Sequence, residues 1–301
     1  MAKIKWRGSY SLPMTPYDDK DRIDEDVYRA QIRFLVESGV AAIAAPLMVG
    51  EFFVLSEAER KLIVRLTVEE CRGTGVPVIG NCAAVNAPLA VEYARYMQEV
   101  GVDALIAMPP YIQKPDFDSI FQYYKLINDA VSIPIWIQNA SLAALSPDQA
   151  IRVCSELEHV SYVKEEVPPE THNIATLVAK NPGCIKGIVG GAGARYLLTE
   201  RDRGAVGNMH ACEFADVVQR VWELMDEGRA QEGEDLFDIV LPGINLEGLM
   251  GMAFAKEIMI RRGVFKNHRV RSSSKPLDAG DMREIDRVYR RIEPHLIWHK
   301  K

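Results

Sequence analysis

Short β-rich runs alternate with longer amphipathic segments along the first 210 residues, and this alternation constrains the fold most. The expected strands cover residues 9–14, 40–47, 76–81, 102–108, 133–138, 160–166, 184–189 and 204–209. Strands that alternate with helices form right-handed βαβ units and a parallel sheet. Eight such units predict closure into a (β/α)8 TIM barrel.

Amphipathic helical patterns separate these strands. They cover residues 24–39, 56–71, 88–101, 119–131, 146–157 and 194–202. Ser56 and Glu59 have the spacing of a capping box, and Gly39 and Gly101 stand where helices should end. After residue 210 the strand signals stop, and three helical stretches follow at about 212–228, 245–262 and 280–297. We therefore expect a barrel core over residues 1–211 and a C-terminal helical extension over residues 212–301.

An open, doubly wound sheet is the competing architecture. Such a sheet often carries a GxGxxG turn that opens the first helix and binds a dinucleotide. Here the glycine-rich run GGAGA begins only at Gly190, and no acidic residue follows it at the expected spacing. The barrel remains the preferred prediction.

Composition narrows the classes of function. Of the 301 residues, 48% are hydrophobic and 26% are charged, and the formal net charge is −6. This balance gives no electrostatic footprint for nucleic acid, so we expect no nucleic-acid partner. The locally basic segment from Lys266 to Lys275 is typical of a solvated loop.

The five cysteines form no CxxC pair and no Cys/His ligand cluster, so we expect reduced thiols and no metal site. The start MAKIKWRGSY lacks the apolar core of a signal peptide, and no run approaches 18 apolar residues. We therefore expect a cytoplasmic enzyme with no membrane partner.

A lysine interrupts the apolar strand expected over residues 160–166. Strand alternation places Lys164 on one face with Glu166, and Glu165 on the other face toward the surrounding helices. A buried cation must find a partner or release its proton, and a neutral amine can form a Schiff base with a carbonyl substrate. The residues alone leave two interpretations open: a nucleophile, or an ordinary ion pair with a neighbouring glutamate.

The carboxyl ends of barrel strands and the loops after them supply the reactive groups in this architecture. Glycines there permit close approach of a substrate, whereas amides, hydroxyls and carboxyl groups can bind it. Each also has a structural interpretation, because polar, Gly and Pro residues commonly end strands. The candidates at the expected strand ends are Ser11, Val49, Gly50, Tyr111, Gln138, Asn139, Lys164, Glu166, Gly190 and Gly191.

Five motifs resemble, in order and spacing, those of the dihydrodipicolinate synthase / N-acetylneuraminate lyase superfamily. They are SLPMTPYDDKDRID (11–24), VGEFFVLSEAER (49–60), MPPYIQKP (108–115), PIWIQNAS (134–141) and YVKEE (162–166). The resemblance implies a class I Schiff-base aldolase or dehydratase on a (β/α)8 barrel with C-terminal helices. It also implies a homo-oligomer, either a tetramer or a dimer, with Lys164 as the Schiff-base lysine.

The chain departs from the superfamily pattern at several site positions. Met48 and Val49 stand where most members have two threonines that hold the substrate carboxylate. Gln138 replaces the tyrosine that serves as proton relay, and Ile112 replaces a second tyrosine, whereas Tyr111 is retained. A glutamine amide cannot shuttle a proton as a phenol can. The usual equipment for dihydrodipicolinate synthesis or sialic acid cleavage is therefore incomplete.

A narrower similarity is to the L-2-keto-3-deoxyarabonate dehydratase group, on the fifth and sixth strands and the LPGIN segment (241–245). It implies dehydration of a 2-keto-3-deoxypentonate to 2-ketoglutarate semialdehyde, with a covalent imine on Lys164 and no other cofactor. Glu166 is then either the acid and base or only a counter-ion of Lys164. The alternatives are a pyruvate-releasing aldolase or a dihydrodipicolinate synthase-like enzyme, and a non-catalytic barrel that binds a keto acid.

Overall fold

The computed structural model describes residues 6–112 and 115–298. Eight strands follow one another in chain order around a closed barrel, which confirms the predicted (β/α)8 fold. The strands are β1 (Gly8–Leu12), β2 (Ala42–Ala45), β3 (Val78–Asn81), β4 (Ala104–Ala107), β5 (Ile135–Ala140), β6 (Val160–Glu166), β7 (Gly187–Gly190) and β8 (Gly207–Ala211). Two parts of the sequence discussed above, MAKIK and Gln113–Lys114, lie outside the described residues.

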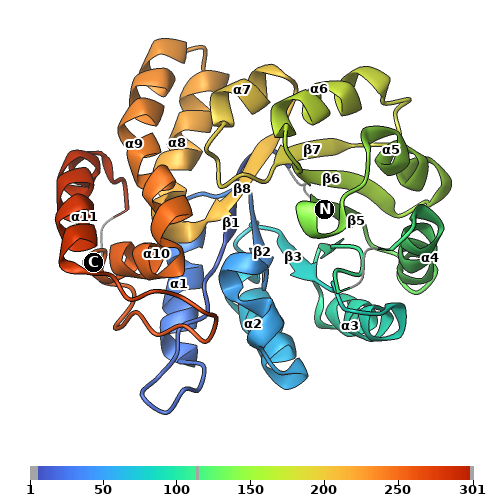
Figure 1. Cartoon of the computed structure of the whole chain (residues 1–301), viewed down its shortest axis with the longest axis horizontal. Helices are drawn as coiled ribbons and strands as arrows, with labels where there is room; N and C mark the ends of the chain where they lie inside the picture. Colours follow the sequence, from blue (N-terminus) through green and yellow to red (C-terminus); the bar gives the residue numbers. More distant parts are fainter. Residues whose placement is uncertain (1–5, 113–114, 299–301) are drawn as a thin grey trace. The chain divides into compact units, whose positions relative to one another are not determined.

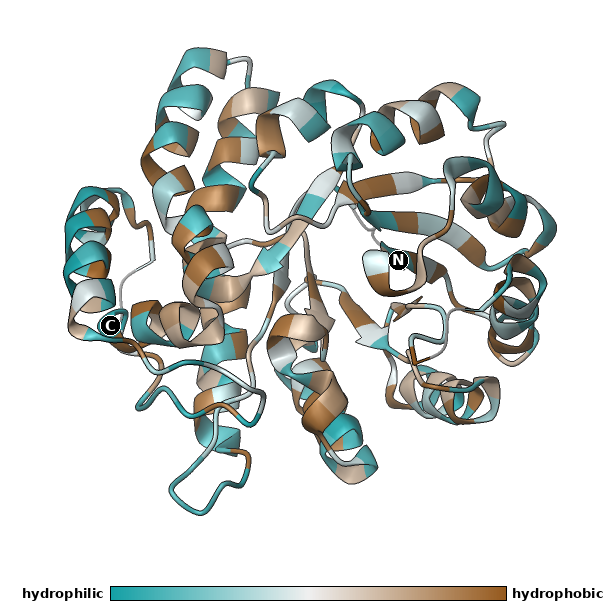
Figure 2. Cartoon of the chain, in the orientation of Figure 1, coloured by the Kyte–Doolittle hydropathy of each residue, from teal (hydrophilic) through white to brown (hydrophobic). Residues whose placement is uncertain are grey.

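Helices follow the strands and also make up the C-terminal extension. They are α1 (Glu25–Glu37), α2 (Glu57–Cys71), α3 (Ala87–Val100), α4 (Phe117–Asn128), α5 (Pro147–Glu156), α6 (Glu170–Lys180), α7 (Leu197–Asp202), α8 (Ala215–Asp226), α9 (Ala230–Met250), α10 (Met252–Arg261) and α11 (Ala279–Ile292). Figure 2 shows polar and apolar residues alternating along helices such as α4 and α11, as expected for helices with one buried face. In the described part of the chain, no helix has the length and apolar character needed to cross a membrane.

The chain divides into two compact units. One contains residues 77–192 and 196–209; the other contains residues 1–76, 193–195 and 210–301. In the first unit, helices α3 to α6 run around the outside of the strands from β3 to β7 (Figure 1). The boundary expected at residue 211 stays a prediction.

In the first unit, the register of three parallel strands sets the geometry of the candidate site. Gln138 on β5 pairs with Lys164 on β6, which pairs with Val189 on β7. Partners in a parallel ladder present their side chains to the same face of the sheet. Two residues earlier on the same strands, Trp136 of β5 and Tyr162 of β6 stack with their ring centroids 4.5 Å apart, so an aromatic layer packs beneath the lysine.

The predicted helix ends are largely confirmed. The Ser56 hydroxyl accepts from the Glu59 amide, and the Glu59 carboxylate accepts from the Ser56 amide, so the capping box is present. Gly101 caps α3 in the left-handed conformation, with φ of 101°. Helix α6 was not predicted. It follows Pro169 without a side-chain cap and buries Ile174 and Leu177, which gives a weak periodic signal.

The C-terminal helices differ from the expected pattern. The single helix predicted over 245–262 is wrong, because α9 begins at Ala230 and a break at Gly251 separates it from α10. Gly251 has φ 67° and ψ −152°, a combination that favours glycine. Pro242 lies inside α9. Because proline normally ends or kinks a helix, the sequence did not indicate a helix that continues through this residue.

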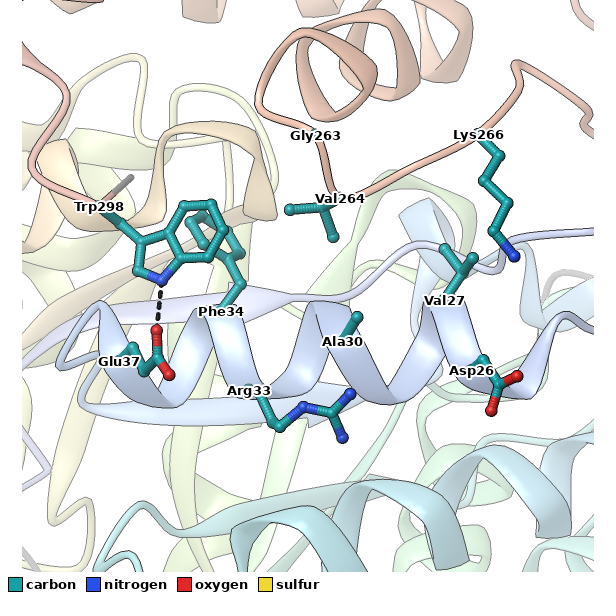
Figure 3. A pocket seen from close by; sticks show the side chains of 10 residues that line it. All are labelled: Asp26, Val27, Ala30, Arg33, Phe34, Glu37, Gly263, Val264, Lys266 and Trp298. Carbon is teal, nitrogen blue, oxygen red and sulfur yellow. Dashed lines mark hydrogen bonds between the residues drawn. The ribbon is translucent and has the colours of Figure 1, made fainter. Parts of the chain in front are cut away.

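The basic segment between α10 and α11 is fastened by ion pairs within the second unit. Lys266 lies 2.9 Å from Asp24, and Arg271 lies 2.8 Å from Glu59. Figure 3 shows a surface cavity between α1 and this segment, where the Trp298 indole donates to Glu37 at 2.6 Å. These contacts make the segment a structural strap rather than a freely solvated loop.

A buried ion pair anchors the C-terminal segment in the second unit. The Arg262 guanidinium forms two hydrogen bonds with the Asp216 carboxylate, at 2.8 and 2.7 Å, and both side chains are 1% exposed. Asp216 also accepts the backbone N–H groups of Ile297 and Trp298. This pair therefore links α8, α10 and the end of the described chain.

Asp216→Asn should lower the free energy of unfolding by about 3–5 kcal/mol, because it leaves a buried guanidinium without its counter-charge. Urea unfolding followed by tryptophan fluorescence measures this change. The matched control is Asp286→Asn in the Arg261–Asp286 pair, whose aspartate is 53% exposed, and this change should cost less than about 1 kcal/mol. Similar losses in both variants would contradict the anchoring role of Asp216.

Candidate active site

Strand β6 separates its three charged residues onto two faces. The Lys164 ammonium lies 2.8 Å from the Glu166 carboxylate, and Lys164 is 2% exposed. Glu165 points the other way, where its carboxylate accepts the Val167 amide at 2.9 Å. The prediction that Lys164 and Glu166 share a face is confirmed, and that face is the inner one in a barrel whose helices lie outside.

Gln138 joins this face from the neighbouring strand. Its side-chain amide donates to the second oxygen of Glu166 at 2.7 Å. The Glu166 carboxylate is thus held between an ammonium group and an amide. A protonated lysine cannot attack a carbonyl, and Glu166 is placed to accept the proton that Lys164 must lose.

Gly191 packs directly against the two charged residues. A Cβ atom at this position would lie 2.6 Å from the Glu166 Cβ and 3.0 Å from the Lys164 Cε. The Gly191 amide donates to the Glu165 carbonyl at 2.8 Å, which fixes the backbone beside β6. Only glycine can occupy this position, because any side chain would collide with Glu166. The structure therefore brings Gly191 together with Lys164 and Glu166.

Gly190 contacts a different group. A Cβ atom there would lie 1.8 Å from the Glu200 carboxylate of α7, so Glu200 packs on the outer side of β7. The structure therefore does not bring Gly190 to the lysine face. Its missing side chain makes room for a buried acid that the sequence interpretation missed.

Asn139 also faces away from Lys164, because it is one residue past Gln138 on β5. Its side-chain nitrogen donates to Glu165 at 2.7 Å and to the Leu145 carbonyl at 3.0 Å. Its oxygen accepts the Leu145 amide at 2.7 Å. The expectation that Asn139 contacts substrate needs correction. Strand alternation turns its carboxamide away from Lys164, and the two hydrogen bonds to Leu145 close the loop after β5.

Two buried acids form the outer layer behind the lysine strand. Burial raises the pKa of Glu165 to about 7, against the opposing effect of the Asn139 hydrogen bond. Burial, with the nearby charge of Glu170, raises the pKa of Glu200 to about 8. Asn208 donates a short hydrogen bond to Glu200. Glu200 occupies a buried position on an amphipathic helix, and that position is the sequence signal that could have identified it.

The remaining candidates have less defined surroundings. Tyr111 is partly exposed in the loop after β4, beside Ile112, which is 72% exposed. Ser11, Val49 and Gly50 belong to the other compact unit. There Ser11 is fully buried, and its hydroxyl has no hydrogen-bond partner among the described residues.

Across residues 6–112 and 115–298, no group of three or more His, Cys, Asp and Glu side chains is arranged to hold a metal ion. The functional groups that the described site brings together are the Lys164 amine, the Glu166 carboxylate and the Gln138 amide. An amine beside a carboxylate suits covalent catalysis on a carbonyl compound.

The parallel barrel and the buried lysine–glutamate pair near the end of its sixth strand are the features that the sequence resemblance led us to expect. The comparison with family models agrees: residues 5–246 match the dihydrodipicolinate synthetase family. The chain belongs to this family.

Relatives with named activities fall into two groups. An L-2-keto-3-deoxyarabonate dehydratase from Azospirillum brasilense is 28% identical over 97% of this chain and 96% of its own length. A probable 5-dehydro-4-deoxyglucarate dehydratase from Streptomyces coelicolor is 34% identical over 48% of this chain and 46% of its own. A 4-hydroxy-tetrahydrodipicolinate synthase from Bradyrhizobium diazoefficiens is 32% identical over 54% and 55%, respectively.

Solved structures support the fold. The dihydrodipicolinate synthase from Rhodopseudomonas palustris superposes with a TM-score of 0.87, covering 96% of this chain and 98% of that one. The sequences are 22% identical, so this likeness establishes the architecture and not the substrate.

The stability of the chain should fall as pH rises through the titration of Glu165 and Glu200. Their folded pKa values, about 7 and about 8, lie above the ordinary 4.5. The stabilisation that their neutral forms provide is therefore complete below about pH 4.5 and lost as pH rises toward 8. We expect Glu200→Gln to reduce the loss between pH 5 and pH 9 by at least about 1.4 kcal/mol, the equivalent of one pKa unit.

Urea unfolding at a series of pH values measures this effect, with wild type and Glu200→Gln compared at each pH. Glu156→Gln, which alters an exposed acid on α5, is the control and should keep the wild-type slope. Parallel curves for wild type and Glu200→Gln would show that Glu200 does not ionise in this range.

Proposed function

We propose that this family member is a Schiff-base-forming lyase that dehydrates a 2-keto-3-deoxypentonate to 2-ketoglutarate semialdehyde. The observation that carries the proposal is the shared carboxylate of Glu166, held 2.8 Å from the Lys164 ammonium and 2.7 Å from the Gln138 amide nitrogen. The first step needs a lysine with a proton acceptor at hand. The later steps need an acid and base that is not a tyrosine, and Glu166 supplies it.

The reaction begins when the Lys164 amine attacks the C2 ketone, and water leaves to give a protonated imine. The imine acts as an electron sink, so a C3 proton passes to the Glu166 carboxylate and an enamine forms. The enamine expels the C4 hydroxyl as water once a neighbouring acid protonates it, and we assign this proton transfer to Glu166. Loss of a C5 proton and protonation at C3 then give an enol between C4 and C5, which becomes the aldehyde when its hydroxyl loses a proton and C4 gains one. Hydrolysis of the imine releases the semialdehyde and frees Lys164.

The substrate carboxylate needs its own partner. By resemblance to the family, the loop after β2 holds it, but here Met48 and Val49 have no hydroxyl. We assign this role to the backbone amides of Val49 and Gly50. Tyr111 contributes a phenolic donor in the loop after β4, and Ser11 is a further candidate for substrate contact.

A pyruvate-releasing aldolase or a synthase-like reaction is the second candidate, because synthases stand among the relatives. Both routes share the imine and diverge at the next bond broken. Aldol cleavage requires a base on the C4 hydroxyl, which is the task of the tyrosine that Gln138 replaces. The named activities of two dehydratase relatives also favour dehydration.

Borohydride reduction in the presence of pyruvate should trap a covalent adduct on Lys164, because reduction makes the imine irreversible. Mass spectrometry of the intact chain and its peptides locates the added mass. Lys256 is an internal control, since it is also buried and paired with a glutamate, Glu51. An adduct on Lys256, or none at all, would exclude the covalent mechanism and leave a non-catalytic keto-acid-binding barrel.

Glu166→Gln should lower turnover of a 2-keto-3-deoxypentonate by about 100-fold or more, the usual contribution of a general acid or base. Product analysis on a panel of pentonates and hexonates should show semialdehyde without pyruvate for the wild type. Release of pyruvate alone would replace the dehydratase with the aldolase.

The control for this variant is Glu165→Gln, which alters the adjacent acid on the opposite face of β6. It should retain turnover within a few-fold, because Gln resembles the protonated carboxyl that burial favours there. Full activity of Glu166→Gln would reduce Glu166 to a counter-ion of Lys164.

A further inference from the structure

The loop after β2 has an unusual backbone course. A 3-10 turn at Met48–Gly50 leads into Glu51, which adopts the left-handed conformation with φ of 57°. The Gly50 carbonyl accepts a hydrogen bond from the Thr15 hydroxyl at 2.6 Å. Non-glycine residues rarely adopt this conformation unless surrounding contacts hold them there. The contacts of the Glu51 side chain must therefore hold the residue in this conformation.

The Glu51 side chain is completely buried and binds the strap between α10 and α11. One carboxylate oxygen accepts the Arg271 amide at 2.9 Å and the Ser272 amide at 2.7 Å. The same oxygen accepts the Ser272 hydroxyl at 2.7 Å. Three donors from the strap thus converge on one residue of the loop.

The second carboxylate oxygen faces a buried lysine. Lys256 on α10 is 0% exposed, and its ammonium lies 3.4 Å from Glu51 and 2.8 Å from the Thr15 carbonyl. It also donates to the Arg269 carbonyl and lies 5.0 Å from the centre of the Tyr17 ring. Thr15 therefore contacts both the loop, through its hydroxyl, and Lys256, through its carbonyl.

Burying two charges in this way is costly, and apolar residues of similar size often stabilise a fold as well. An ion pair does fix geometry, because each group is satisfied in one arrangement. The residues just before Glu51 are the apolar Met48 and Val49, followed by Gly50. A loop that offers backbone N–H groups in place of hydroxyls depends on a rigid main chain, because amides cannot reorient as side chains do.

We propose that Glu51 and Lys256, with Ser272, form a positioning clamp that holds the backbone of Val49 and Gly50 in the orientation that binds the substrate carboxylate. This inference rests on the proposed function, which gives those two residues their role. Glu51, Lys256 and Ser272 act through the loop and do not contact substrate. Through the strap, the C-terminal helices thereby take part in substrate binding.

Ser272→Ala is the decisive variant, because it removes one hydrogen bond to Glu51 and keeps both buried charges. We expect KM for the keto acid to rise about 3- to 10-fold, the equivalent of one lost hydrogen bond, with kcat within twofold. Amide hydrogen exchange should accelerate in a peptide spanning residues 46–54 and stay unchanged in one spanning residues 160–167. Ser273→Ala, at the exposed neighbouring serine, is the control and should match wild type in both measurements.

Glu51→Gln should show the same effects more strongly, and if it does not fold, Ser272→Ala still decides the question. Unchanged exchange in residues 46–54 would overturn the clamp. Faster exchange with an unchanged KM would reduce it to a stabilising contact with no role in binding. Absence of a borohydride adduct in the wild type would instead refute the proposed function, while exchange, measured without substrate, would still report whether the clamp holds the loop.

Discussion

The two-residue alternation of strand β6 is the constraint on which the candidate site depends. It places Lys164 and Glu166 on one face and Glu165 on the other, so adjacent residues in the chain enter different chemical environments. The parallel register with β5 then adds Gln138 to the lysine face and Asn139 to the outer face. A shift of one residue in that register would exchange both sets, and loop closure by Asn139 through Leu145 opposes such a shift.

The molecule accommodates its buried charges in distinct ways, and the difference separates structure from chemistry. Asp216 and Arg262 satisfy each other and the end of the described chain. Lys256 is surrounded by a carboxylate, two carbonyls and an aromatic ring, all held by other contacts. Lys164 instead shares its carboxylate with the Gln138 amide, a neutral partner that does not compensate its charge. A substrate carbonyl can therefore replace the ion pair at Lys164 with far less disruption than at Lys256.

The features of the fold and the site that local rules determine could be predicted from the sequence. Strand and helix periodicity located the eight strands, and the spacing of Ser56 and Glu59 predicted a real capping box. The common face of Lys164 and Glu166 follows from alternation alone. The features that could not be predicted depend on residues far away in the chain. The backbone amides that donate to Glu51, for example, come from residues 220 and 221 positions further along. Helix α6 was not predicted because no side-chain cap marks its start.

Gln138 links the architecture to the choice of reaction. Its amide nitrogen donates to Glu166, so its carbonyl oxygen remains an acceptor, and a glutamine has no proton to relay. In the proposed reaction, the proton transfer that a tyrosine would perform at this position passes to the carboxylate that Gln138 holds. A carboxylate beside the imine nitrogen is well placed to move protons at C3 and C4 of the bound substrate. Cleavage of the C3–C4 bond needs the proton removed from the C4 hydroxyl, whereas dehydration needs that hydroxyl protonated. In the proposed reaction, formation of the protonated imine consumes the proton that Glu166 took from Lys164, so Glu166 is again a carboxylate. It can then take the C3 proton and, as an acid, deliver a proton to the C4 hydroxyl, which is what dehydration requires.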